Sequence, residues 1–119
     1  CVNAAAQYAG LAALTGPKEP ILKMVSEFDM RRKVIVSALN DLKGVSCIDS
    51  AGAFYAFPNI SGTGFSSSQA QDLFLDQAGV ATIAGTSFGT FGEGYLRFSY
   101  ANSKENILRA IERIDKILT

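Results

Sequence analysis

The sequence predicts an α+β fold in which a small sheet of about four strands is covered by helices. Two observations lead to this prediction. Segments with helical spacing of apolar residues lie at both ends of the chain, and short runs rich in aromatic and β-branched residues lie between them. With 119 residues, the chain is long enough to form one domain with its own core.

The chain begins with an alanine-rich segment, residues 3–14, that favours a helix. Its apolar residues are scattered around the whole circumference, so this helix needs cover on nearly every side. A domain of this size could hardly surround it. We therefore expect residues 1–16 to pack against a partner surface that is missing from this chain.

A second helix is expected from residue 19 or 20 to residue 43, with Gly44 as its stop. Its apolar residues recur in alternating steps of four and three, and Arg32 is the only polar residue in that stripe. Such a helix would span ~36 Å, which exceeds the body of a domain of this size. Residues 17–43 are therefore expected to bridge to another lobe.

Residues 44–119 are expected to form the α+β body. Residues 45–48 and 52–57 have the pattern of a β-hairpin, because a turn-forming stretch separates two short apolar runs. The glycine-rich residues 61–67 match a phosphate-binding loop only in part, since the full glycine fingerprint and the P-loop lysine are missing. An ordinary connecting loop is the simpler interpretation.

Further helix and strand signals complete the body. Ser68 and Gln71 predict a capping box that opens a helix, and residues 80–83 read as a short strand. Asn102 or Ser103 is expected to cap an amphipathic helix at the C-terminus.

The strand over residues 94–100 carries the candidate site residue, Arg97, between aromatic neighbours. A guanidinium cannot lose its proton and is costly to bury unpaired, so the strand needs an anion from the protein or from a ligand. The guanidinium fork matches a carboxylate or a phosphate. Alternatively, Arg97 is a solvated edge-strand residue that packs on Tyr95 and pairs with Glu93.

The composition argues against several function classes. Acidic and basic residues balance at 11 each, which does not favour a nucleic-acid partner or an anionic membrane surface, and no apolar run is long enough to span a membrane. The chain has no histidine, so any chemistry of its own would rest on a carboxylate, lysine, tyrosine or cysteine. Cys1 and Cys47 lack metal-ligand spacing, so no metal site is expected and a reduced, cytoplasmic setting is the default. An organelle stays open, because any targeting segment would precede Cys1.

Several motifs follow one another along the chain: Asn3-Ala4-Ala5-Ala6-Gln7, Ala12-Ala13-Leu14-Thr15-Gly16-Pro17, Arg31-Arg32, Gly52-Ala53-Phe54-Tyr55, Ala78-Gly79-Val80, Gly85-Thr86-Ser87-Phe88-Gly89 and Gly92-Glu93-Gly94-Tyr95-Leu96-Arg97-Phe98-Ser99-Tyr100-Ala101. In this order, and over essentially the whole chain, they resemble the C-terminal part of class I pyridoxal-phosphate-dependent aminotransferases, with aspartate aminotransferase-like members the most similar. Ala51 and Ala84 depart from the pattern, because many relatives have proline there.

The resemblance implies the C-terminal lobe of a fold-type I enzyme that transfers an amino group between an amino acid and a 2-oxo acid. Its large domain would hold pyridoxal 5'-phosphate on a lysine, the small domain would close over the substrate, and the full-length protein would be a homodimer. In that family the arginine at the position of Arg97 binds the α-carboxylate of the substrate. Whether the substrate is aspartate, an aromatic or another amino acid stays open.

The lysine that binds the cofactor, the phosphate cup and the groups that contact the pyridine ring belong to an upstream part of the family's fold. Ser103-Lys104 looks superficially like the lysine segment, but it reads better as the start of a helix. We therefore expect no catalytic and no cofactor-binding residue in residues 1–119, a missing N-terminal large domain, and no activity from this chain alone. Two alternatives are a stand-alone α+β module that binds amino acids or regulates through Arg97, and an RNA-recognition module with stacking aromatics.

Overall fold

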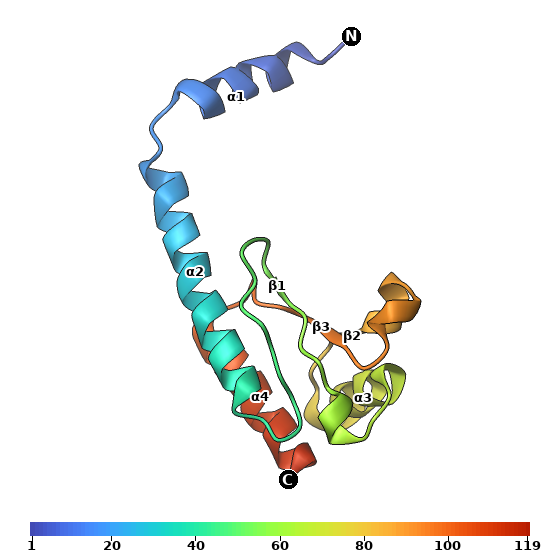
Figure 1. Ribbon diagram of the computed structural model, residues 1–119. Helices are drawn as coiled ribbons and strands as arrows, with labels where there is room; N and C mark the ends of the chain where they lie inside the picture. The colour runs from blue at the N-terminus through green and yellow to red at the C-terminus, as the bar shows by residue number, and fades with distance from the viewer.

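The computed structural model describes residues 1–119 and has an α+β architecture, which confirms the predicted fold class (Figure 1). Its helices and strands are α1 (Ala4–Thr15), α2 (Glu19–Asn40), β1 (Tyr55–Ala56), α3 (Ser67–Leu73), β2 (Ile83–Ala84), β3 (Leu96–Ser99) and α4 (Lys104–Leu118). A π-helical turn, Phe74–Ala78, extends α3, and two 3₁₀ turns, Gly85–Phe88 and Thr90–Gly92, lie between β2 and β3.

The three strands form one antiparallel sheet in the order β1-β3-β2, so β3 is its central strand. Tyr55 of β1 pairs with Ser99, and Ile83 of β2 pairs with Arg97. Along β3, Leu96 is fully buried while Arg97 is only partly covered. The predicted alternation is confirmed, because successive side chains of a strand face opposite sides of the sheet.

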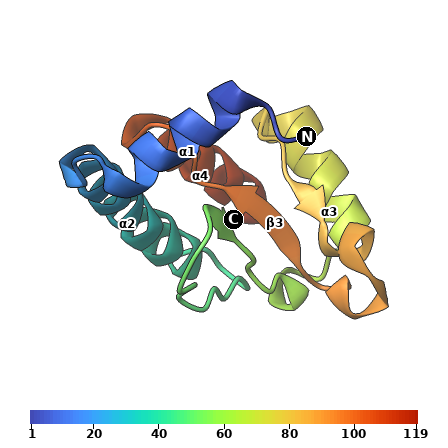
Figure 2. The same ribbon diagram turned by 90° about the horizontal axis from the view of Figure 1, so that it is seen from above.

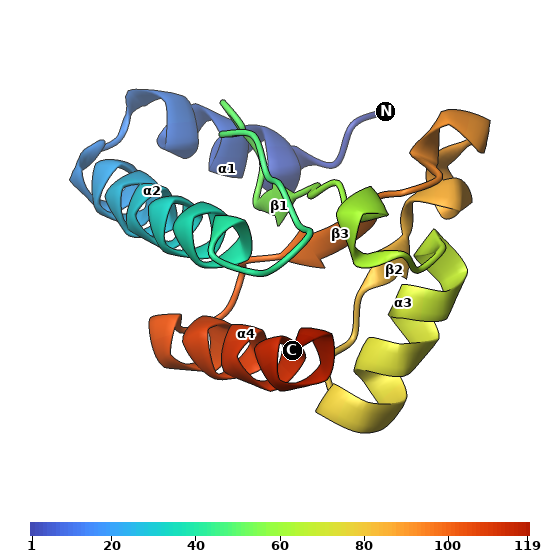
Figure 3. The same ribbon diagram turned by 60° about the horizontal axis from the view of Figure 1, so that its bottom comes forward.

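The hydrophobic core lies on the side of the sheet that Leu96 faces. Helices α2 and α4 lie side by side there, while α3 covers the other flank (Figure 3). The buried side chains of α4 recur in steps of four and three, which is the pattern that the sequence shows for this helix. The core members are Ile35, Leu39, Leu42, Cys47, Ala56, Ile60, Ala70, Phe74, Ala78, Leu96, Phe98, Tyr100, Ile107, Ile111 and Ile114.

The sheet has three strands where about four are predicted, because residues 45–48 do not form one. Asn40, at the end of α2, binds both backbone groups of Cys47: its side-chain oxygen accepts from the Cys47 N–H at 2.8 Å and its nitrogen donates to the Cys47 carbonyl at 2.9 Å. Those groups are then not free for a ladder. The predicted hairpin is therefore wrong: Ser46 makes a single bridge, to Asn59, which lies beyond the predicted second strand, and residues 55–56 of that strand pair with β3.

The predicted capping box at Ser68 and Gln71 is wrong by two residues. Ser66 is the N-cap: its hydroxyl accepts from the Gln69 N–H, and the Gln69 side chain accepts from the Ser66 N–H. The Gln71 side chain instead accepts a 2.7 Å hydrogen bond from the Ala84 N–H at the outer edge of β2. That strand covers Ile83–Ala84, at the end of the predicted range of 80–83 and one residue beyond it.

Helix α2 ends at Asn40, three residues before the predicted end, and Gly44 forms a turn beyond it with φ of +76°. Only the C-terminal half of α2 is buried in the core. Arg32, the polar residue of its stripe, pairs with Asp29 at 2.7 Å and also with Asp49, so it joins the helix to the segment that follows Cys47. Hydrogen bonds from Lys33 and Arg32 lower the pKa of Asp29.

Helix α1 and the first turns of α2 project away from the rest of the molecule (Figure 1), and seen from above α1 runs from the start of α2 toward the side on which α3 lies (Figure 2). No residue of α1 is buried, although most of its side chains are apolar. Leu14, for example, is 80% exposed. None of the helices combines the length and the apolar character that crossing a membrane would require.

Candidate functional site

Arg97 lies on the face of the sheet opposite the core, between two aromatic rings. Its guanidinium carbon is 4.3 Å from the ring centroid of Tyr55 and 4.5 Å from that of Phe88. Tyr55 belongs to β1 and Phe88 follows β2, so the rings reach Arg97 from the two flanks of β3. Cation–π contacts of this kind restrict the rotamers of a long side chain while preserving its charge.

No carboxylate of the chain pairs with Arg97, as its absence from the five ion pairs of the structure shows. Glu93, the partner that the sequence suggests, instead accepts a 2.9 Å hydrogen bond from the Ser67 N–H at the start of α3. Tyr95 stacks on Phe57, with ring centroids 5.2 Å apart. The guanidinium therefore keeps donors available for an external anion.

A closed loop carries the Phe88 ring to Arg97. The loop runs from Gly85 to Gly92, and the backbones of these two glycines touch, so that a side chain on either would meet the other's carbonyl oxygen. The Gly85 N–H also donates to the Tyr95 carbonyl at 2.8 Å. This closure directs Phe88 back over the sheet and leaves Phe91 at the tip, 98% exposed.

The sequence identifies Arg97 and its strand, but not the residues that hold it. Tyr55 and Phe88 lie 42 and nine positions from Arg97 in the sequence, and only the pairing of the strands brings the three together. Ser67, whose hydroxyl binds the backbone before β3, carries no sequence signal beyond being a serine near a helix start.

The chain itself does not fit a covalent pyridoxal-phosphate site. Every lysine is exposed on the surface, and two of them are engaged in ion pairs on their own helices, Lys33 with Asp29 and Lys116 with Glu112. In the glycine-rich loop over residues 61–67, Gly62 packs directly against the backbone of Gly44. That glycine serves a close approach of two chain segments.

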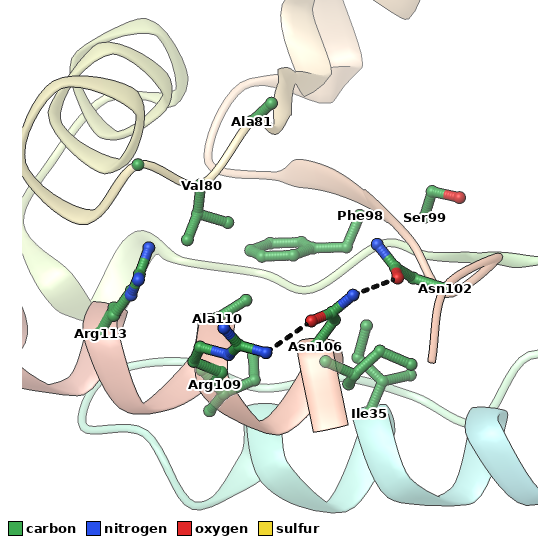
Figure 4. A pocket seen from close by; sticks show the side chains of 13 residues that line it. Ile35, Val80, Ala81, Phe98, Ser99, Asn102, Asn106, Arg109, Ala110 and Arg113 are labelled. Atoms are coloured by element: carbon green, nitrogen blue, oxygen red, sulfur yellow. Dashed lines mark hydrogen bonds between the residues drawn. The ribbon is translucent and has the colours of Figure 1, made fainter. Parts of the chain in front are cut away.

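A separate hollow lies between α4 and residues 79–81 (Figure 4). Phe98 projects into it, while Arg97, its neighbour on β3, faces the other way. One rim is a hydrogen-bonded row in which the Arg109 guanidinium donates to Asn106, whose amide donates to Asn102. This hollow is therefore not part of the Arg97 site.

Known proteins match this chain over nearly its whole length. A family model described as aminotransferase class I and II matches residues 1–114. The chain is 45% identical over 114 residues to an aspartate aminotransferase of Pyrococcus horikoshii, and 37% identical to aromatic-amino-acid aminotransferase 2 of Thermococcus litoralis. Each match covers 94% of this chain and 29% of the relative.

Solved structures agree. An alanine aminotransferase from Pyrococcus furiosus superposes with a TM-score of 0.93 at 32% identity, covering 99% of this chain and 30% of that one. An aromatic aminotransferase from P. horikoshii superposes with a TM-score of 0.88 at 39% identity, covering 94% and 30%. The chain thus spans about three tenths of the length of the relatives that it matches.

Proposed function

Because this chain belongs to the class I and II aminotransferase family, we propose that it forms the C-terminal part of an amino acid aminotransferase. The full-length enzyme would transfer an amino group between an amino acid and a 2-oxo acid. Relatives whose names specify aspartate, aromatic amino acids or alanine as substrates support an amino acid substrate of one of these classes.

Arg97 is the residue of this chain that binds the substrate, through its α-carboxylate. The observation that carries this assignment is a guanidinium restrained by two rings and paired with no carboxylate of its own chain. A planar carboxylate can accept two parallel hydrogen bonds from the guanidinium fork, which fixes the orientation of the substrate as well as its position. Arg97 thereby orients the α-carbon toward the groups that move its proton.

Pyridoxal phosphate, the cofactor implied by the family, would be held by residues outside this chain. When bound it supplies an electron sink for the α-carbon of the substrate. The lysine and the phosphate contacts would come from a large domain that precedes residue 1, and the full-length protein would be a homodimer. The uncovered apolar surface of α1 fits a helix that packs on that large domain, with residues 17–43 bridging to the body, residues 44–119.

The assignment of Arg97 is tested in the full-length protein by Arg97→Ala. We expect kcat/KM for amino acids to fall by an amount equivalent to about 2–4 kcal/mol of transition-state binding, because a charged hydrogen-bonding partner is lost. Arg97→Lys should recover only part of this loss, since a lysine cannot form the bidentate pair. The cofactor absorbance should stay unchanged in both variants.

Arg109→Ala is the matched control, because Arg109 is an exposed arginine that lines the separate hollow on α4. It should leave kcat/KM unchanged. If Arg97→Ala behaves like this control, Arg97 does not bind the substrate.

A second experiment separates the enzyme part from a stand-alone binding module. Residues 1–119 alone are mixed with pyridoxal phosphate and treated with borohydride, and no lysine should be trapped. Calorimetric titration of the same chain with amino acids should give no measurable heat of binding. A specific trapped lysine or tight amino acid binding would favour the independent module.

A further inference from the structure

We propose that Ser67 and Glu93 form a latch that positions Arg97 for carboxylate binding. Both are positioning residues, since neither contacts the guanidinium, and this inference rests on the proposed function. The latch joins the start of α3 to the turn over residues 92–95, the backbone segment that leads directly into β3.

The hydroxyl of Ser67 uses its full hydrogen-bonding capacity on that turn. It accepts from the Gly94 N–H at 2.9 Å and from the Tyr95 N–H at 3.2 Å, and it donates to the Gly92 carbonyl at 3.3 Å. Ser67 is 0% exposed, so water cannot replace these bonds. A single side chain therefore fixes three backbone groups of the turn, those of Gly92, Gly94 and Tyr95.

Glu93 closes the latch from the other side. Its carboxylate accepts the 2.9 Å hydrogen bond from the Ser67 N–H, the first residue of α3. A negative charge is favourable at that position, because the free N–H groups of a helix start carry partial positive charge. The turn and α3 are thus joined by one side chain from each: Ser67 of α3 binds the backbone of the turn, and Glu93 of the turn binds the backbone of α3.

Two supports of Arg97 begin at this turn. Tyr95, whose N–H binds Ser67, is two residues before Arg97 on the same face of the strand. Gly92, whose carbonyl binds Ser67, touches Gly85 and closes the loop that carries Phe88 over the guanidinium. A shift of the turn would therefore displace both β3, which carries Arg97, and the ring of Phe88.

The test is Ser67→Ala in the full-length protein, with Ser66→Ala as the matched control. Ser66 caps the same helix, but its side chain binds Gln69 and does not reach the turn. We expect Ser67→Ala to raise KM for the amino acid about tenfold, since the loss of one charged hydrogen bond between the guanidinium and the carboxylate corresponds to a factor of this order in affinity. Ser66→Ala should leave KM unchanged.

Dependence on Arg97 is tested by making Ser67→Ala in the Arg97→Ala background. If the latch acts through Arg97, the serine substitution adds nothing there. An equal rise of KM in both backgrounds, or a rise equal to that of Ser66→Ala, would overturn the inference. An Arg97→Ala variant with unchanged kcat/KM would instead refute the proposed function, so the two failures are distinguishable.

If the Ser67→Ala variant does not fold, substitutions of Glu93 test the same proposal. Glu93→Ala removes the acceptor and should raise KM, while Glu93→Gln keeps an acceptor oxygen and should restore most of the affinity. If both Glu93 variants keep the original KM, the latch does not position Arg97.

Discussion

The contacts of Arg97 with the rings of Tyr55 and Phe88 lead to a quantitative prediction about substrate binding. Replacing Tyr55 and Phe88 by leucine removes the aromatic faces but keeps apolar bulk and the arginine charge. Each ring lies within 4.5 Å of the guanidinium carbon, and a contact of this kind is worth about 0.5–1 kcal/mol when it is partly exposed. Without the rings, the Arg97 side chain becomes ordered only when the substrate binds, and the free-energy cost of this ordering lowers the affinity for the substrate.

The magnitude follows from these values. A loss of 0.5–1 kcal/mol corresponds to about a two- to fivefold rise in KM for each single variant. If the two contacts are independent, Tyr55→Leu combined with Phe88→Leu should raise KM by about 5- to 30-fold. Steady-state kinetics of the full-length protein with an amino acid donor measures this directly.

Phe91→Leu is the control for the ring substitutions. Phe91 lies in the same loop as Phe88, but its side chain is 98% exposed and makes no contact with the guanidinium. KM should therefore stay at its original value. A double variant of Tyr55 and Phe88 with the same KM as the Phe91 variant would refute the view that the rings restrain Arg97.

Three further predictions concern stability and reactivity of this chain. Gly92→Ala should lower the free energy of unfolding in urea by about 1–3 kcal/mol, because its Cβ would meet the Gly85 carbonyl, whereas Gly52→Ala, with open space around it, should change it by less than about 0.5 kcal/mol. The neighbouring lysine and arginine lower the pKa of Asp29, so its stabilising contribution is complete above its ordinary value of 3.8 and is lost as the pH falls through the lowered pKa. Urea titrations at about pH 6 and about pH 3 should therefore show a smaller acid-induced loss for Asp29→Asn than for the original chain. Burial raises the pKa of the Cys47 thiol, so a thiol reagent should label the exposed Cys1 quickly and Cys47 only after denaturant is added; equal labelling rates would contradict the buried position.

The strand with Arg97 could be predicted from sequence because its information is local. Alternation of apolar and polar residues over 94–100 is enough to place Leu96 inward and Arg97 outward. The final helix could be predicted for the same reason, since Ser103 and the spacing of the isoleucines after it lie within one segment.

The remainder of the site depends on contacts between distant residues, which a single sequence does not reveal. Glu93 is an obvious ion-pair partner for Arg97 by proximity, yet the start of α3 takes its carboxylate. The hairpin at residues 45–48 fails for a similar reason, because the amide of Asn40 occupies the backbone groups that a ladder would use. In both cases a side chain bound to backbone overrides the local pattern.

The position of β3 in the middle of the sheet has a consequence for synthesis on the ribosome. Both edge strands are translated before the strand with which they pair, so the sheet cannot assemble until residue 99 has emerged. Until then the aromatic residues around β1 have no partner strand. Folding of the sheet therefore waits for β3, and while it waits the nascent chain carries unpaired strands that are prone to aggregation.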